Sequence, residues 1–573
     1  MKTIECDVVV VGSGASGLAT AVTASQKGLN VIVIEKSDKF GGTTARSGGW
    51  LWIPCTQAAK DWGYHDSHEA VKTYLKHEAR EAYNEERVDS FLQHASEAYD
   101  FFTQNTAVQF DMPLTYPDYH SEAPGGAQGG RSMVTRPFDA KQLGQELQYL
   151  EPPLPELTIF GMAVGSGVQI KHFLRATRSV ESFLYTVKMF SKHFLDVLRY
   201  GRGMLLSNGN ALAGRLMKSA LDQKIPMLRH TAAKELVLEN GVVRGLVAET
   251  AEGMLRIKAS QGVVLAAGGF PHNPELRKKF FPHVITGKEN WSPAKETSTG
   301  DSFELVKSLD VRQDTHLPNA AAWSPVSLVP RKDGTTGIMP HFIDRARPGV
   351  IAVKKDGKRF MNEANSYHDY VQEMIKDLPE NEEPISWLVC DHKTLRSYGL
   401  GCVAPYPLPM TRHLKSGYLK KGNSIEELAQ VCGIDSNGLI DTIERFNRMA
   451  KAGRDSDFGR GSRAYNRYLG DALHTPNPCV APIEQGPFYA MQIRPGDIGT
   501  YAGLPVDQHS RVLDQNKNPI QGLFCVGNDA TSIMGGNYPG AGITLGPALV
   551  FGYQTGLYLA NNTDRNLDRA ADE

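Results

Sequence analysis

A tyrosine near the end of the chain lies in a glycine-rich stretch that leaves hydrogen-bond donors open to a ligand. Residues 535–549 read GGNYPGAGITLGPAL, with five glycines and two prolines around Tyr538. The glycines and prolines disfavour a regular strand and also disfavour one continuous helix. The Tyr538 hydroxyl and the backbone N–H of Gly542 could both donate to one oxygen and stabilise negative charge on it. A glycine there would leave the backbone open to a flat ring.

The start of the chain carries a second chemical signature. Residues 7–36 read DVVVVGSGASGLATAVTASQKGLNVIVIEK, a pattern that predicts strand, turn, helix and strand. Gly12, Gly14 and Gly17 form GxGxxG, and Glu35 ends the second strand, where its carboxylate can accept from a ribose hydroxyl. The spacing predicts a dinucleotide site, and the alternative is a glycine turn in an ordinary βαβ unit.

A second glycine- and hydroxyl-rich loop, KSDKFGGTTARSGGW, directly follows Glu35. This loop favours FAD, because an extended FAD needs donors that continue toward its flavin. The predicted cofactor contacts are Gly12, Gly14, Ala15, Ser16, Gly17, Glu35, Lys36, Gly42, Thr43, Thr44, Ser47, Gly48, Gly49, Ala233, Ala267, Gly268, Gly269, Asp301, Gly527, Asn528, Gly542, Thr544 and Leu545.

Composition excludes several other classes of protein. Across 573 residues, 62 Lys and Arg nearly balance 63 Asp and Glu, which argues against a nucleic-acid binder. The seven cysteines are scattered without a CxxC pair, so we expect no metal site and a reducing, cytoplasmic compartment. The apolar run after the first residues ends in the glycine motif, so we expect no targeting segment. No stretch reaches the length of about 18 apolar residues that a spanning helix needs.

Later segments extend the predicted α/β architecture. The stretch VLENGVVRGLVAE predicts a hairpin around Asn240 and Gly241. GVVLAAGGF and GLFCVGNDAT each predict a buried strand that ends in glycine, as in a doubly wound sheet. We therefore expect a discontinuous Rossmann-like FAD-binding domain, residues 1–313 and 481–573, and an inserted α+β capping domain for substrate, residues 314–480.

Residues at about 152–205 form an insertion with a basic, amphipathic part. Between Lys171 and Arg202, seven Lys and Arg residues accompany only Glu181 and Asp196. One interpretation is a pair of helices packed on the FAD domain. The other is peripheral contact with anionic lipid at the inner membrane face.

The FAD-type loop resembles that of the flavoprotein family of fumarate reductase and succinate dehydrogenase. Membrane-bound members of that family attach FAD through a histidine in this loop, and no histidine lies between Met1 and Lys60, so we expect non-covalent FAD. Dicarboxylate-binding members use arginine and histidine where this chain has Tyr538 and Ser298. A dicarboxylate without these cations would leave buried charge unpaired, so we expect an apolar, neutral substrate.

The chain is similar to the 3-ketosteroid dehydrogenase branch of this family. The resemblance covers most of the chain and is strongest at KSDKFGGTTARSGGWLWIP, DYHSEAPGG, KRFMNEANSYHDY and GNYPGAGITLGPALVFGY. It implies removal of an α-proton and a β-hydride beside a ring ketone, with introduction of the Δ1 double bond. It also implies that Tyr538 and Gly542 hold the carbonyl, that Tyr367 is the base and that Tyr119 assists it. Tyr116 is a rival of Tyr119, and Tyr489 is expected to be structural.

Three alternatives stay open at this point. The first is Δ4-(5α)-dehydrogenation or desaturation of a simpler cyclic ketone. The second is an enoate reductase, against which the missing Arg and His count. The third is the flavoprotein subunit of an electron-transfer assembly, against which the missing flavin-linking histidine and cysteine clusters count. The electron acceptor, a quinone or an artificial dye, cannot be identified from the residues.

Overall fold

The first of two large sheets carries the predicted nucleotide-binding topology. The structure, a computed structural model, describes residues 1–113, 115–166, 168–176, 179–312, 317–376, 378–379 and 382–562. The parallel strands are β10 (Met227–Leu228), β2 (Val31–Ile34), β1 (Lys2–Val11), β13 (Gly253–Leu265) and β21 (Pro519–Cys525). Residues 8–11 of β1 are buried, as the continuous valine run predicts for a strand covered on both faces.

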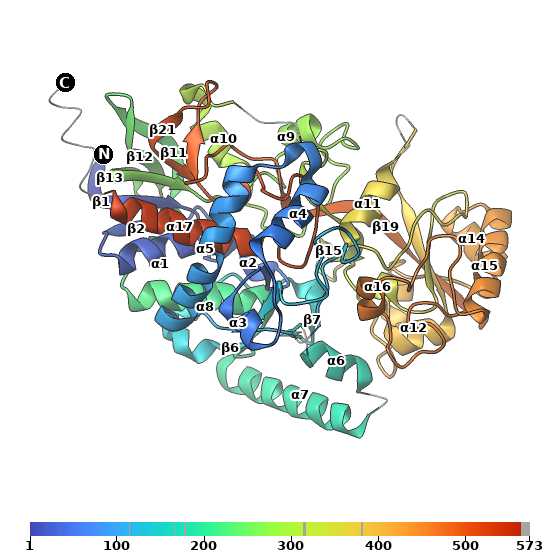
Figure 1. Ribbon diagram of the computed structural model, residues 1–573. Helices are drawn as coiled ribbons and strands as arrows, with labels where there is room; N and C mark the ends of the chain where they lie inside the picture. The colour runs from blue at the N-terminus through green and yellow to red at the C-terminus, as the bar shows by residue number, and fades with distance from the viewer. Residues whose placement is uncertain are drawn as a thin grey trace.

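The helices that follow the glycine motif also agree with the prediction. Helix α1 (Ala15–Gln26) packs against α8 (Asn208–Asp222) and against the C-terminal helix α17 (Leu545–Asn561), so both chain ends build this part of the molecule (Figure 1). A Cβ at Gly17 would lie 2.1 Å from the Gly12 carbonyl oxygen, which explains the glycine where helix meets strand. The predicted hairpin joins β11 (Ala232–Glu239) to β12 (Val242–Thr250), and Asn240 and Gly241 adopt positive φ of 53° and 80°.

The second sheet is antiparallel and belongs to the capping part at the right of Figure 1. Its order is β15 (Thr336–Pro340), β14 (Ala321–Pro330), β19 (Phe488–Thr500), β17 (Ser386–Asp391) and β16 (Val350–Val353), with β18 (Lys420–Gly422) beside β19. Helices α11 (Tyr367–Ile375), α12 (His392–Tyr398), α14 (Ile425–Cys432), α15 (Ser436–Lys451) and α16 (Ala464–Leu469) accompany it. The α/β fold with an α+β cap is thus confirmed.

The domain bounds stay a prediction. The first, between residues 313 and 314, lies outside the described residues. For the second, the pairing of β19 with β14 and β17 favours a boundary after Thr500 rather than at 480.

The insertion contains two short strands, β7 (Thr158–Ile159) and β8 (Met162–Ala163), and two helices, α6 (Val168–Arg175) and α7 (Val180–Tyr200). Helix α7 runs along the lower edge of the molecule in Figure 1. Thr177 and Arg178, which fall in the predicted basic stretch, lie outside the described residues. Among the described helices, none combines the length and apolar character that crossing a bilayer requires.

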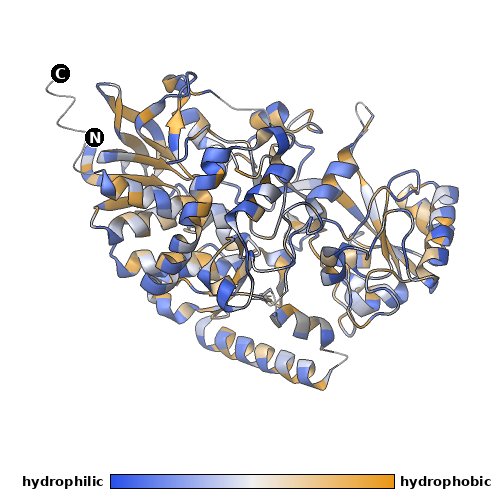
Figure 2. Ribbon diagram, in the orientation of Figure 1, coloured by the Kyte–Doolittle hydropathy of each residue, from blue (hydrophilic) through white to orange (hydrophobic). Residues whose placement is uncertain are grey.

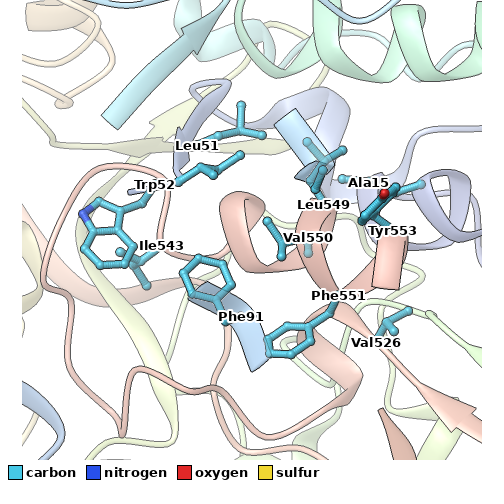
Figure 3. Packing of buried hydrophobic residues seen from close by; sticks show 14 of the residues in the cluster. Ala15, Leu51, Trp52, Phe91, Val526, Ile543, Leu549, Val550, Phe551 and Tyr553 are labelled. Carbon is cyan, nitrogen blue, oxygen red and sulfur yellow. The ribbon is translucent and has the colours of Figure 1, made fainter. Parts of the chain in front are cut away.

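An aromatic core holds the glycine-rich loop in place. Figure 3 shows Trp52 of β3 (Trp50–Trp52), Phe91 of α5 (Glu85–Asn105) and Ile543 of the loop beside the first turns of α17. The Trp52 and Phe91 rings stack with centroids 6.3 Å apart, and Phe91 lies 6.0 Å from Phe551 of α17. The loop is therefore packed against a rigid core despite its glycines.

Candidate active site

One cleft opens where the parallel strands end. Its walls come from Gly12 after β1, Glu35 after β2, Gly268 after β13 and Gly527 after β21, together with the start of α1. Ligands in open α/β sheets bind at this edge, where the carboxyl ends of the strands meet and helix N-termini point inward.

Most of the predicted cofactor residues line this cofactor cleft. They are Gly12, Gly14, Ala15, Ser16, Glu35, Lys36, Gly42, Thr43, Thr44, Ser47, Ala233, Ala267, Gly268, Asp301, Gly527, Asn528, Thr544 and Leu545. Gly48, Gly49 and Gly542 line an adjoining cavity instead. Gly17 and Gly269 line neither space: Gly17 packs on Gly12, and the Gly269 N–H donates to Asp529 Oδ1 at 2.8 Å.

The polar groups of the cleft fit an extended dinucleotide. A Cβ at Gly14 would meet only Thr44 Oγ1, at 3.6 Å, so the backbone there is open to the cleft and a diphosphate can approach it. Glu35 Oε2 accepts from the Ser13 hydroxyl at 2.7 Å, and among the described residues Oε1 accepts only the Ser37 N–H, at 3.0 Å. Oε1 therefore retains a lone pair for a ribose hydroxyl. The cleft residues thus fit FAD.

Asp529, next to the cleft residue Asn528, is a structural residue that the sequence did not reveal. Its buried carboxylate accepts from the N–H groups of Ala267 and Gly269 and from the Ser302 hydroxyl, and so fixes the turn after β13. Burial raises the pKa of Asp529 despite these bonds. GNDAT places Asp529 beside the predicted Asn528, but its partners are more than 200 residues away, so no local pattern reports them.

The adjoining cavity, which we call the tyrosine cavity, brings the predicted catalytic residues together. Tyr119, Tyr367, Tyr538 and Gly542 all line it, and it encloses about 2180 Å³ with its mouth included. Thr43, Ser47, Ile498, Thr544 and Leu545 line both this cavity and the cofactor cleft. The two spaces are therefore neighbours, and the start of α17 borders both.

The three tyrosines form one buried cluster. Ring centroids are 4.8 Å apart for Tyr367 and Tyr538, and 5.5 Å apart for Tyr119 and each of the others. The Tyr119 hydroxyl donates to the Tyr367 hydroxyl at 3.3 Å. Burial raises the pKa of Tyr538 to about 12, and raises the pKa of Tyr119 and Tyr367 well above 10. All three are thus neutral phenols at neutral pH. A neutral phenol can donate a hydrogen bond directly, whereas it can act as a base only as the tyrosinate or by relaying its own proton.

Gly542 also lines the tyrosine cavity. Among the described residues, no group accepts a hydrogen bond from its N–H. Its φ of +90° and a backbone contact both demand glycine, because a Cβ would lie 2.3 Å from the Trp50 carbonyl carbon. The glycine therefore serves the close passage of the loop over β3.

A charged network ties together the chain segments that carry the tyrosines. His120 Nδ1 lies 2.8 Å from Glu78 Oε2, and His120 Nε2 lies 3.1 Å from Asp369 Oδ2. Glu78 Oε2 also accepts from Asn537 Nδ2 at 2.6 Å. Burial alone would lower the pKa of His120, but the two carboxylates raise it well above 6.5, so the imidazole is charged.

The network reaches each tyrosine through the backbone. His120 follows Tyr119, Asn537 precedes Tyr538, and Asp369 lies one residue beyond His368, which follows Tyr367. The Tyr119 N–H further donates to the Pro539 carbonyl oxygen at 2.9 Å. These bonds fix the three segments relative to one another from the side away from the cavity.

Several cavity residues were not predicted. The Tyr465 ring lies 4.3 Å from that of Tyr119, and Trp50 lies 4.3 Å from Tyr116. Tyr116, the rival of Tyr119, also lines the cavity, with its ring tilted against that of Trp50. Tyr489, expected to be structural, lies in β19 with its hydroxyl 3.1 Å from His392 Nδ1. A single aromatic residue carries no sequence signal that separates a cavity wall from the core.

The chain is similar to known proteins over nearly its whole length. The family described as FAD binding domain matches residues 7–545. A 4-oxocyclohex-2-ene-1-carboxylate 5-dehydrogenase of Sinomonas cyclohexanicum is 42% identical over 100% of this chain and 97% of its own. A 3-oxosteroid 1-dehydrogenase of Mycobacterium tuberculosis (strain ATCC 25618 / H37Rv) is 36% identical over 99% of this chain and 100% of its own.

A solved structure agrees with these relatives. The 3-ketosteroid delta1-dehydrogenase of Sterolibacterium denitrificans, in complex with 1,4-androstadiene-3,17-dione, superposes with a TM-score of 0.90 at 34% identity. The superposition covers 98% of this chain and 100% of that one.

Proposed function

The chain belongs to the FAD-binding-domain family and, within it, to the FAD-dependent 3-ketosteroid dehydrogenase group, so FAD is its cofactor; we propose that it desaturates a ring ketone beside the carbonyl. The observation that carries the proposal is the convergence of three buried tyrosines and a free glycine N–H on one cavity next to the cofactor cleft. A reaction that builds negative charge on a carbonyl oxygen needs donors there and a base nearby.

In this proposal, Tyr538 and Gly542 bind the ketone oxygen. The raised pKa of Tyr538 keeps its hydroxyl protonated, so it donates as charge develops on the oxygen. Polarisation makes the α-hydrogen acidic. Tyr367, once ionised to the tyrosinate, takes it as a proton and becomes a phenol again, while the C–H electrons form the enolate double bond. The Tyr119 hydroxyl, which donates to Tyr367, stabilises the tyrosinate.

Bound FAD would accept the hydride that leaves the β-carbon, and a later electron acceptor would reoxidise it. The FAD would be held non-covalently by the residues of the cofactor cleft, among them Gly14, Glu35 and Asp301. The buried cluster of aromatic rings excludes water from the carbonyl oxygen, which strengthens both donated hydrogen bonds.

Two ring-ketone classes suit this chemistry. One is the 3-ketosteroids, desaturated at Δ1, which the relatives of Mycobacterium tuberculosis and Sterolibacterium denitrificans name. The other is an oxocyclohexene carboxylate, which the relative of Sinomonas cyclohexanicum names. Anaerobic mixing of the holoenzyme with each ketone tests the proposal: a ring ketone that is a substrate bleaches the flavin absorbance. If no member of either class bleaches it, the proposal fails.

For the insertion, we propose a peripheral contact with an anionic lipid surface through α7. The helix buries polar side chains and exposes apolar ones. His193 and Asp196 are buried. Phe183, Leu195 and Leu198 are 54%, 66% and 84% exposed. Lys188, Lys192 and Arg199 are also exposed along it. Figure 2 shows hydrophobic and hydrophilic residues mixed on this helix, as in a segment that lies in a membrane interface.

Sedimentation with vesicles tests this contact. The protein should sediment with vesicles that contain phosphatidylserine and much less with pure phosphatidylcholine, and Leu195→Asp with Leu198→Asp should abolish it. Unchanged sedimentation of the double variant would contradict the proposal. A loss of self-association in that variant without any vesicle binding would instead assign the face to a second copy of the chain.

A further inference from the structure

The wall of the tyrosine cavity is unexpectedly basic for a neutral substrate. The lining residues include four arginines, Arg46, Arg175, Arg347 and Arg467, and one acidic residue, Asp471. Arg46 is neutralised, since it pairs with Glu151 at 2.8 Å and with Glu296 at 2.7 Å. Arg175 and Arg467 are exposed. Arg347 differs from these three, because it is partly buried and has no ion pair within the described residues.

Arg347 presents a guanidinium with spare donors to the cavity. Its Nη1 donates to the Gly470 carbonyl oxygen at 2.7 Å, and its guanidinium lies 5.9 Å from the centroid of Tyr398. Within the part of the chain that the structure describes, it makes no ion pair. Burial lowers the pKa of Arg347, and the charge of the nearby Asp471 offsets this only in part. Arginine has five N–H donors in a planar fork, so most of them stay available to a ligand.

Among the described residues, the Asp471 carboxylate forms no ion pair with the Arg347 guanidinium. Its Oδ2 accepts from the Tyr398 hydroxyl at 2.9 Å and its Oδ1 accepts from the Leu473 N–H at 3.1 Å. A desolvated guanidinium without a bonded counterion is costly to keep in a folded protein. An anionic ligand group that reaches Arg347 would remove that cost and gain a bidentate, charge-assisted pair.

Helix α16 links Arg347 to the tyrosine cluster. Tyr465 of α16 contacts Tyr119, and Gly470, directly after the helix, accepts a hydrogen bond from Arg347. Tyr465, Gly470, Arg347 and Tyr538 all line the tyrosine cavity. One ligand in this cavity can therefore face the tyrosines at one end and Arg347 at the other.

We propose that Arg347 binds a carboxylate of the substrate and that the enzyme acts on ring ketones bearing this group at the end of the ring away from the ketone. The inference rests on the proposed function, since it takes the ketone to be held by Tyr538 and Gly542. The expectation of a neutral substrate came from positions 298 and 538 alone. Arg347 supplies a cation on the wall of the tyrosine cavity, which Tyr538 also lines.

The test compares 4-oxocyclohexane-1-carboxylate with its methyl ester, which differs only in charge at the far end. Both are titrated anaerobically into wild-type holoenzyme, Arg347→Leu, Arg347→Lys and a surface control, Arg445→Leu. Wild-type enzyme should bind the acid more tightly, and Arg347→Leu should weaken acid binding by roughly 10²- to 10³-fold, the usual cost of losing one partner of a buried charge pair. In Arg347→Leu, binding of the ester and flavin reduction by it should stay unchanged. The affinity for the acid should be intermediate in Arg347→Lys and like that of the wild type in Arg445→Leu.

Equal wild-type affinity for acid and ester would overturn the inference, and so would an equal loss of both in Arg347→Leu. If Arg347→Leu loses its flavin or unfolds, the affinities of the wild-type enzyme for the acid and for the ester decide whether the inference holds. The proposed function fails separately: in that case neither compound, nor 4-androstene-3,17-dione, bleaches the wild-type flavin. Bleaching by the steroid and the ester but not by the acid would keep the function and reject the role of Arg347.

Discussion

The Tyr119 hydroxyl lies 3.3 Å from the Tyr367 hydroxyl, although 248 positions separate the two residues in the chain. One comes from the loop before β5 (Ser132–Thr135) and the other begins α11 of the cap. The pair therefore joins the two parts of the molecule at the tyrosine cavity. The hydrogen bond that supports the proposed base crosses that junction, so the proposed chemistry depends on the cap being in place.

Tyr538→Phe should lower the rate of flavin reduction by roughly 10²- to 10³-fold, as for loss of one oxyanion donor. The flavin spectrum and FAD content should not change, because Tyr538 lines the tyrosine cavity and not the cofactor cleft. Stopped-flow reduction at saturating ketone measures the effect. A rate near that of the wild type would remove Tyr538 from the carbonyl site.

His120→Asn should misplace all three tyrosines, because it breaks the bonds to both Glu78 and Asp369. We expect flavin reduction to fall roughly 10²-fold, the scale of a 1 Å displacement at a reacting group. FAD content should stay the same. His392→Asn, which removes a ring bonded to Tyr489 on β19, is the matched control.

The stability of the same variant should depend on pH in a defined direction. The pKa of His120 is raised in the folded state, so its stabilising contribution is complete below about 6.5 and is lost as pH rises through the raised pKa. Chemical denaturation should therefore show a large deficit of His120→Asn at low pH that narrows at alkaline pH. A deficit independent of pH would show that the imidazole is not charged.

The rate of flavin reduction should rise with pH. Burial raises the pKa of Tyr367 well above 10, so the ionised fraction of a direct base grows about tenfold per pH unit between roughly pH 6 and 9. Tyr538, with its pKa near 12, stays a donor over this range. Tyr538→Phe should keep the slope and Tyr367→Phe should flatten it. A flat profile in the wild type would indicate that proton removal does not limit reduction.

Glu35→Ala should weaken FAD binding, because the cleft loses its carboxylate acceptor for a ribose hydroxyl. Equilibrium dialysis of the apoprotein with FAD measures the change. Acid precipitation of the wild type should release all flavin to the supernatant. Flavin that stays with the pelleted protein would contradict non-covalent binding.

Local patterns predicted the elements whose causes are local. Strand β1, the glycine turn, helix α1 and the hairpin at Asn240 each follow from hydrophobic periodicity and from glycines at positive φ. The sequence also indicated Tyr119, Tyr367 and Tyr538 through their motifs. It did not reveal Arg347, Asp529 or the role of His120, because their partners are brought together only by the docking of the cap and by the two chain ends.

The central claim is that Tyr367 removes the α-proton of a ketone held by Tyr538 and Gly542. Exchange of the α-hydrogen with deuterated water measures that step alone, since it needs the base but no transfer of hydride. In Tyr367→Phe we expect flavin reduction to fall by roughly 10²- to 10⁴-fold, the usual contribution of a positioned base. Exchange should fall in parallel while the ketone still binds. Slow reduction with undiminished exchange would contradict the claim and would transfer the role of base to another residue of the cluster, first of all Tyr119.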